Sequence, residues 1–72
     1  MPDDHVYLVS EIVGTSPDGV DAAIRNAITR ASKTVRELDW FEVTQIRDHL
    51  LEGGEIGHFQ VTLKIGFRVE ER

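Results

Sequence analysis

The sequence predicts an α+β fold, in which a β-α-β-β chain forms a three-stranded antiparallel sheet partly wrapped around one helix. Three observations lead to this prediction. Apolar and polar residues alternate over residues 58–69, an apolar stripe of helical period crosses the first half of the chain, and two glycines separate two strand-like segments. The 72 residues contain no linker or repeat, so we expect a single domain over residues 1–72.

The first element is predicted to be a strand over residues 6–13, because this segment is apolar and rich in β-branched side chains. Gly14 is expected to end it. Ser16 then fits the N-cap of a helix, and Pro17 fits the first helical position, where a missing amide hydrogen is tolerated.

The helix is predicted to continue to about Leu38, a length of about 22 residues and roughly 33 Å. Its apolar residues recur every three or four positions and form one stripe that suits packing on a sheet. They are Val20, Ala23, Ile24, Ala27, Ile28, Ala31, Val35 and Leu38.

A second strand is expected over residues 40–50 and a third over residues 58–69, joined by a hairpin turn at residues 52–54. The helix returns the chain along the sheet, so the first two strands point the same way and the third opposes both. With the third strand in the middle, every pair of neighbours is antiparallel.

Composition excludes several classes of function. A formal net charge of −5 argues against a nucleic-acid surface, which needs a basic patch. The chain has no cysteine, and its histidines at positions 5, 49 and 58 lack close metal-ligand spacing, so we predict no metal site. The polar start argues against a signal peptide, and the short apolar runs argue against a membrane span. We therefore expect a cytoplasmic protein without membrane contact. Such a small domain is expected to need self-association.

The only tryptophan, Trp40, stands at the mouth of the second predicted strand. Side chains alternate across a strand, so if Phe41 and Val43 face the helix, Trp40 and Glu42 face the other way. A large aromatic side chain on that second face needs a partner, either another subunit or a flat ligand, and both interpretations stay open at this point. The same face is expected to include Thr44, Ile46, Gln60, Thr62, Lys64 and Arg68.

Several motifs together resemble the bacterial dodecins over nearly the whole chain. They are Glu11-Ile12-Val13-Gly14-Thr15-Ser16, Ala22-Ala23-Ile24, Leu38-Asp39-Trp40-Phe41-Glu42-Val43, Phe59-Gln60-Val61 and Gly66-Phe67-Arg68. Each motif is weak alone, but the ordered set at these spacings is specific.

The resemblance implies a hollow homododecamer that binds flavin, usually FMN, for storage and sequestration. It implies that pairs of flavin rings stack between Trp40 side chains of related subunits and that Gln60 hydrogen-bonds the polar edge of the ring. It places Arg47 near the flavin and links Arg68 with a second ligand, coenzyme A. The negative charge of the chain disfavours the FMN phosphate, which needs a local arginine, lysine or bound cation; if none is well placed, riboflavin is an equally good ligand. No metal site is transferred, since Gln45 stands where some relatives have a carboxylate.

The chemistry of the side chains agrees with most of these implications. Indole is a flat, electron-rich surface for the electron-poor flavin, and the Gln60 amide offers both a donor and an acceptor. Trp40 and Gln60 are predicted to share one face of neighbouring strands, where one ligand would touch both. By alternation Arg47 falls on the Phe41 face instead, unless a bulge redirects it.

Two other classes of function were compared with flavin storage. A structural or coenzyme A-binding oligomer would use Trp40 as an interface residue, with flavin incidental. An enzyme is disfavoured, because the chain shows no Ser/His/Asp set, pocket pair of carboxylates or glycine-rich phosphate loop. The protein is therefore expected to be non-catalytic.

Overall fold

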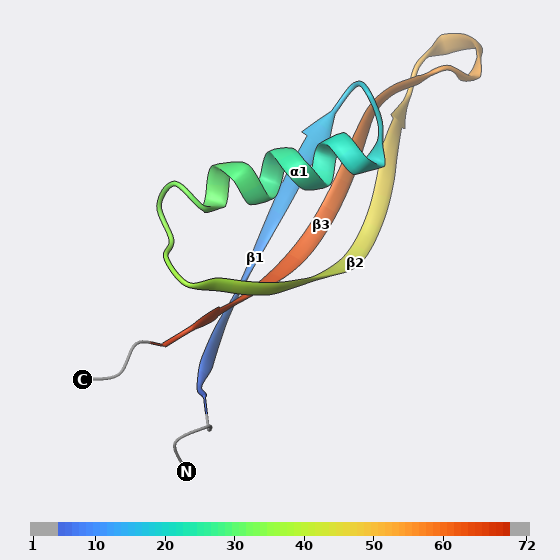
Figure 1. Cartoon of the computed structure of the whole chain (residues 1–72). Coiled ribbons are helices and arrows are strands. Elements are labelled where there is room, and N and C mark those ends of the chain that lie inside the picture. Colours follow the sequence, from blue (N-terminus) through green and yellow to red (C-terminus); the bar gives the residue numbers. More distant parts are fainter. Residues whose placement is uncertain (1–4, 70–72) are drawn as a thin grey trace.

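Three antiparallel strands curve around one helix in the computed structural model, which describes residues 5–69 (Figure 1). The strand order is β1-β3-β2, which confirms the predicted topology with the last strand in the middle. The polar start and the last residues of the predicted domain lie outside the described residues. The elements are β1 (Tyr7–Ser16), α1 (Val20–Ala31), β2 (Leu38–Leu50), the 3-10 turn η1 (Glu52–Gly54) and β3 (Ile56–Arg68).

β1 is longer than predicted, because Gly14 lies inside the strand and does not end it. A Cβ atom at Gly14 would overlap the Ala23 carbonyl of α1 and would lie 2.8 Å from the Ala27 Cβ. The glycine therefore lets the helix approach the sheet closely and has no role in a turn.

The start of α1 also differs from the prediction. Gly19 occupies the N-cap, and the helix begins at Val20, three residues beyond Pro17. Ser16 is the buried last residue of β1, and its Oγ accepts a hydrogen bond from the Asp18 amide at 3.0 Å. Ser16 thus binds a backbone amide as expected, but in the turn before the helix.

α1 ends at Ala31 and does not continue to Leu38. Ser32 and Thr34 follow the helix, and the Ser32 hydroxyl donates to the Thr29 carbonyl at 2.8 Å. Such side-chain bonds compete with the helical pattern of the backbone. Glu37 then adopts a left-handed backbone conformation with φ of 62°, which turns the chain into β2.

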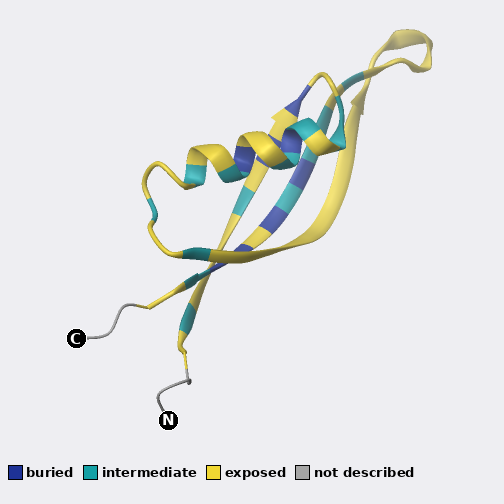
Figure 2. Cartoon of the chain, viewed as in Figure 1, coloured by how far each residue is buried: buried dark blue, intermediate teal, exposed yellow. Residues whose placement is uncertain are grey.

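The core lies between α1 and the middle of the sheet (Figure 2). α1 packs mainly against β1 and β3, and β2 is exposed beyond Leu38, which packs against the core. Phe41 and Val43 lie on the helix side as predicted, but at 47% and 37% exposure they are not core residues. The buried apolar residues are Ala23, Ala27, Val61, Leu63 and Ile65.

The protomer is elongated, because the hairpin of β2 and β3 extends beyond the helix (Figure 1). Its radius of gyration is 15.1 Å, whereas a compact domain of this length has about 11 Å. The hairpin turn is confirmed at η1, where Gly53 and Gly54 both have φ of 86°. No helix within residues 5–69 is long and apolar enough to cross a membrane.

Candidate functional site

The face of the sheet turned away from α1, here called the outer face, holds the candidate residues. On β3 the buried Val61, Leu63 and Ile65 point toward the helix, so the residues between them point outward. Register then assigns the residues opposite them on β1 and β2 to the same face. Trp40, Gln60 and Arg68 lie on the outer face as predicted.

Trp40 covers Gly66 on the neighbouring strand. The two residues are directly opposite in the register, and a Cβ atom at position 66 would overlap the six-membered ring of the indole. Gly66 is buried although it lies on the outer face, because the indole lies over it. Trp40 is itself 41% exposed, so its ring is held against the sheet and remains open to a partner.

Tyr7 supports the indole from the other edge of the sheet. Its ring centroid is 6.2 Å from that of Trp40, with the planes tilted by 60°. The Tyr7 hydroxyl donates to Oδ2 of Asp39, the residue before Trp40, at 2.8 Å. This hydrogen bond to a carboxylate raises the pKa of the Tyr7 phenol above its ordinary value of 10.0. The strand that bears the tryptophan is thus tied to β1.

Arg68 lies at the same end of the sheet, opposite Tyr7. Its guanidinium is 3.7 Å from the Glu37 carboxylate and 3.5 Å from Nε2 of His5. Both members of the ion pair are more than 40% exposed, so it contributes little stability. The arginine can exchange Glu37 for another anion at low cost.

A bulge in β2 moves Arg47 to the outer face. The register shifts between Val43 and Gln45, which leaves Thr44 as the extra residue. Arg47 consequently lies directly opposite Gln60. Simple alternation had placed it on the helix side, with a bulge as the exception. The same shift places Ile46 opposite the buried Val61, so the prediction that Ile46 belongs to the outer face was wrong.

The candidate residues form two separate groups. Trp40 and Arg68 lie at the end of the sheet near the start of β1, whereas Gln60 and Arg47 lie toward the hairpin. Gln60 and Gly66 are six residues apart on β3, which corresponds to about 20 Å. One flavin ring is shorter than that distance, so a ring stacked on Trp40 does not reach Gln60 of the same chain.

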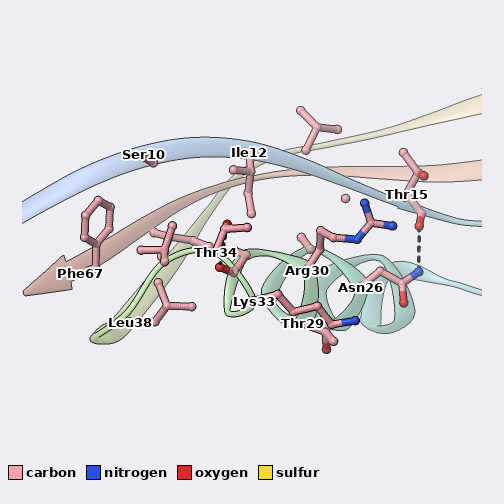
Figure 3. Close-up of a pocket in the computed structure, with 16 residues that line it drawn as sticks. Ser10, Ile12, Thr15, Asn26, Thr29, Arg30, Lys33, Thr34, Leu38 and Phe67 are labelled. Atoms are coloured by element: carbon pink, nitrogen blue, oxygen red, sulfur yellow. Dashed lines mark hydrogen bonds between the residues drawn. The ribbon is translucent and has the colours of Figure 1, made fainter.

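An open groove of about 790 Å³ lies on the opposite side of the sheet, between α1 and β1 (Figure 3). Arg30, Lys33, Ile12 and Phe67 are among the residues that line it, and the Asn26 amide donates to the Thr15 carbonyl at 3.0 Å. None of the four predicted site residues lines this groove. The candidate site is therefore a surface of the sheet and is distinct from the groove.

Sequence reasoning missed three residues that surround Trp40, namely Gly66, Tyr7 and Asp39. Gly66 alternates with the apolar residues of β3, but its match to Trp40 depends on a register shift at Asp39. Tyr7 comes from the far end of the chain and meets Asp39 only through the order of the strands. An outward-facing glycine in a regular strand was the one signal that pointed to a covering aromatic side chain.

Comparisons with known proteins agree on one family. The family model described as Dodecin matches residues 6–70. The dodecin of Thermus thermophilus is 53% identical over 66 residues, covering 92% of this chain and 94% of the relative. The solved dodecin of Streptomyces coelicolor is 63% identical and superposes with a TM-score of 0.87, covering 97% and 99% of the two chains. The dodecin of Streptomyces davaonensis is 58% identical with a TM-score of 0.88, covering 96% and 100%.

Proposed function

The chain belongs to the dodecin family, and from this premise we propose that it binds and stores FMN without catalysing a reaction, as a homododecamer. Trp40 is the platform on which the flavin ring stacks, and Gln60 recognises the polar edge of the ring. The observation that carries the proposal is the pose of Trp40, which lies over Gly66 and keeps 41% of its surface exposed.

The fixed pose matters because stacking on a mobile side chain loses much of its energy in ordering that side chain. The indole packs over Gly66, and the Tyr7 ring lies next to it. A flavin that meets such a surface finds the ring already oriented. Contact between indole and flavin also permits electron transfer to the excited flavin, which quenches its fluorescence and limits its photochemistry.

The distance between Trp40 and Gln60 bears on the assembly. The two side chains are about 20 Å apart along one sheet, so a flavin that touches both takes them from different copies of the chain. Self-association also covers apolar residues that the protomer leaves bare. On the helix side of β2 these are Phe41, Val43 and Ile46, which α1 does not reach.

The phosphate of FMN needs a local cation, because each chain has a formal charge of −5. Arg47 fits this role, since the bulge at Thr44 places it opposite Gln60 on the outer face. A guanidinium there binds phosphate through two parallel hydrogen bonds. Riboflavin lacks the phosphate and would bind through stacking and edge recognition alone.

Coenzyme A is a second ligand class, and the position of Arg68 favours it. This guanidinium is exposed at the same end of the sheet as Trp40, and among the described residues it contacts Glu37 at 3.7 Å and Nε2 of His5 at 3.5 Å. A phosphate of coenzyme A would replace Glu37, and the adenine would find aromatic side chains nearby. In that case Trp40 would serve mainly as an interface residue, and flavin binding would be incidental.

The proposal is tested by titrating the purified chain into FMN while following flavin fluorescence, with riboflavin measured in parallel. Strong quenching that saturates near one flavin per chain is the expected result. Unchanged fluorescence would refute the flavin site and would direct the next titration to coenzyme A.

The sharing of one site between copies has its own experiment. Trp40→Ala and Gln60→Leu chains are assembled separately and also together from the unfolded state. The mixed assembly is expected to regain a fraction of the tight FMN sites that both pure variants lack, because some sites receive Trp40 and Gln60 from different chains. If mixing restores no sites, the two residues do not act on one flavin across a subunit boundary.

A further inference from the structure

The hairpin brings together two histidines that are nine residues apart in the sequence. His49 of β2 lies directly opposite His58 of β3, in the last regular pair before the register shift at Leu50. Both side chains are exposed. Spacing along the chain hides this pair, because the two residues become cross-strand neighbours only through the register of β2 and β3. We call these two residues the histidine pair.

We propose that the histidine pair is a binding site for a transition-metal dication that prefers imidazole, of the class of Cu²⁺, Ni²⁺ and Zn²⁺. The two side chains lie on the outer face, beyond the Arg47–Gln60 pair. Directly opposite residues of an antiparallel pair have Cβ atoms about 4.5 to 5.5 Å apart. A metal–nitrogen bond is about 2.0 to 2.1 Å long, so two exposed rings at that spacing can turn to hold one ion between them.

The donor set selects the class of ion. Imidazole nitrogen suits copper, nickel and zinc, whereas magnesium and calcium require oxygen ligands. The described residues contain no group of three or more His, Asp or Glu side chains that could hold a metal. The remaining coordination positions are therefore left to water, and the pair acts as a two-point chelate on a rigid strand frame.

The frame and its charges favour a moderately tight site. The hairpin beside the pair is closed by hydrogen bonds from the Leu51 amide to the Glu55 carbonyl at 2.7 Å and from the Gly54 amide to the Leu51 carbonyl at 3.1 Å. These bonds hold the two strands in register when the ion binds. Arg47 on the same face opposes a cation, whereas the carboxylates of Glu52 and Glu55 in the hairpin attract it.

The test is a calorimetric titration of the full chain with Cu²⁺, combined with electron paramagnetic resonance of the bound ion. His49→Asn and His58→Asn each remove one ligand. Both positions are exposed, so both variants should fold normally, which circular dichroism checks. His5→Asn is the matched control, because His5 precedes β1 at the other end of the sheet.

We expect one Cu²⁺ per chain with nitrogen hyperfine structure from two imidazoles, and at least a tenfold loss of affinity in each hairpin variant. The His5→Asn variant should retain the affinity and spectrum of the unmodified chain. The proposal is overturned if either hairpin variant binds as tightly as the unmodified protein, or if the spectrum shows a single imidazole. Because copper binding is measured without flavin, this outcome is independent of the flavin proposal.

Discussion

The Trp40→Ala substitution is expected to weaken FMN binding by about 30- to 300-fold. Trp40 is 41% exposed, and a tryptophan offers up to about 250 Å² of surface, so about 100 Å² is open to a ligand. Burying about 40 to 100 Å² of it contributes about 1 to 2.5 kcal/mol. Offset stacking adds about 1 kcal/mol. The sum of about 2 to 3.5 kcal/mol corresponds to this range at about 1.4 kcal/mol per factor of ten.

The assay is a fluorescence titration of FMN at neutral pH, with size-exclusion chromatography of each variant. Trp40→Ala also removes the cover of Gly66, so a second variant, Trp40→Phe, keeps a flat ring at that place. Trp40→Phe should retain the oligomer and part of the affinity. It should quench flavin less, because a phenyl ring is a poorer electron donor than indole.

Phe41→Ala is the matched control for the alanine variant. Phe41 is the next residue and is 47% exposed, but it lies on the helix side of the sheet opposite Ile65. Its removal should change FMN affinity less than threefold if the oligomer persists. The reasoning is refuted if Trp40→Ala binds FMN within threefold of the unmodified protein. Loss of the oligomer in both Trp40 variants would instead identify Trp40 as an interface residue.

Three further predictions concern the surroundings of the indole and the phosphate. Gly66→Ala should displace the Trp40 ring and reduce stability by about 1 to 3 kcal/mol, measured by denaturant unfolding, and an unchanged midpoint would contradict the close contact. Tyr7 is the only tyrosine, so ultraviolet absorbance reports its titration alone. Its raised pKa means that its contribution to stability is present below pH 10 and is lost as the pH rises through the folded-state pKa. Asp39→Asn should lower that pKa toward 10, and an unchanged titration would refute the hydrogen bond as its cause. Arg47→Ala should weaken FMN binding about tenfold by removing a charge-assisted contact, and riboflavin binding should stay the same; equal losses for both ligands would refute the phosphate role.

Local patterns were sufficient for the elements whose environment is simple. β3 is central in the sheet, with a neighbour on each side, so its strict alternation separates a buried face from an outer face without ambiguity. The hairpin was predictable because Gly53 and Gly54 supply the positive φ values that the turn requires. The outward direction of Trp40 was predictable from alternation, because Trp40 and the three residues from Phe41 to Val43 pair regularly with β3.

Patterns failed where a non-local contact decided the outcome. The apolar stripe continues to Leu38, but the helix ends at Ala31, where the Ser32 and Thr34 hydroxyls bond to carbonyls of its last turn, and from Leu38 onward the chain pairs with β3 instead. Gly14 has the sequence signature of a strand end, whereas its role is to admit the backbone of α1. In both cases the preference of a short segment is overridden by a packing or pairing requirement that exists only once the elements are assembled.

Residue periodicity and turn chemistry within short segments are sufficient to predict the β-α-β-β order, the amphipathic helix and the outward tryptophan. The contacts between those side chains follow instead from how the strands pair. The bulge at Thr44 moved Arg47 beside Gln60, and the register brought Trp40 over Gly66 and His49 beside His58. Register and bulges depend on pairing between distant segments, and a shift of one residue turns every later side chain to the other face.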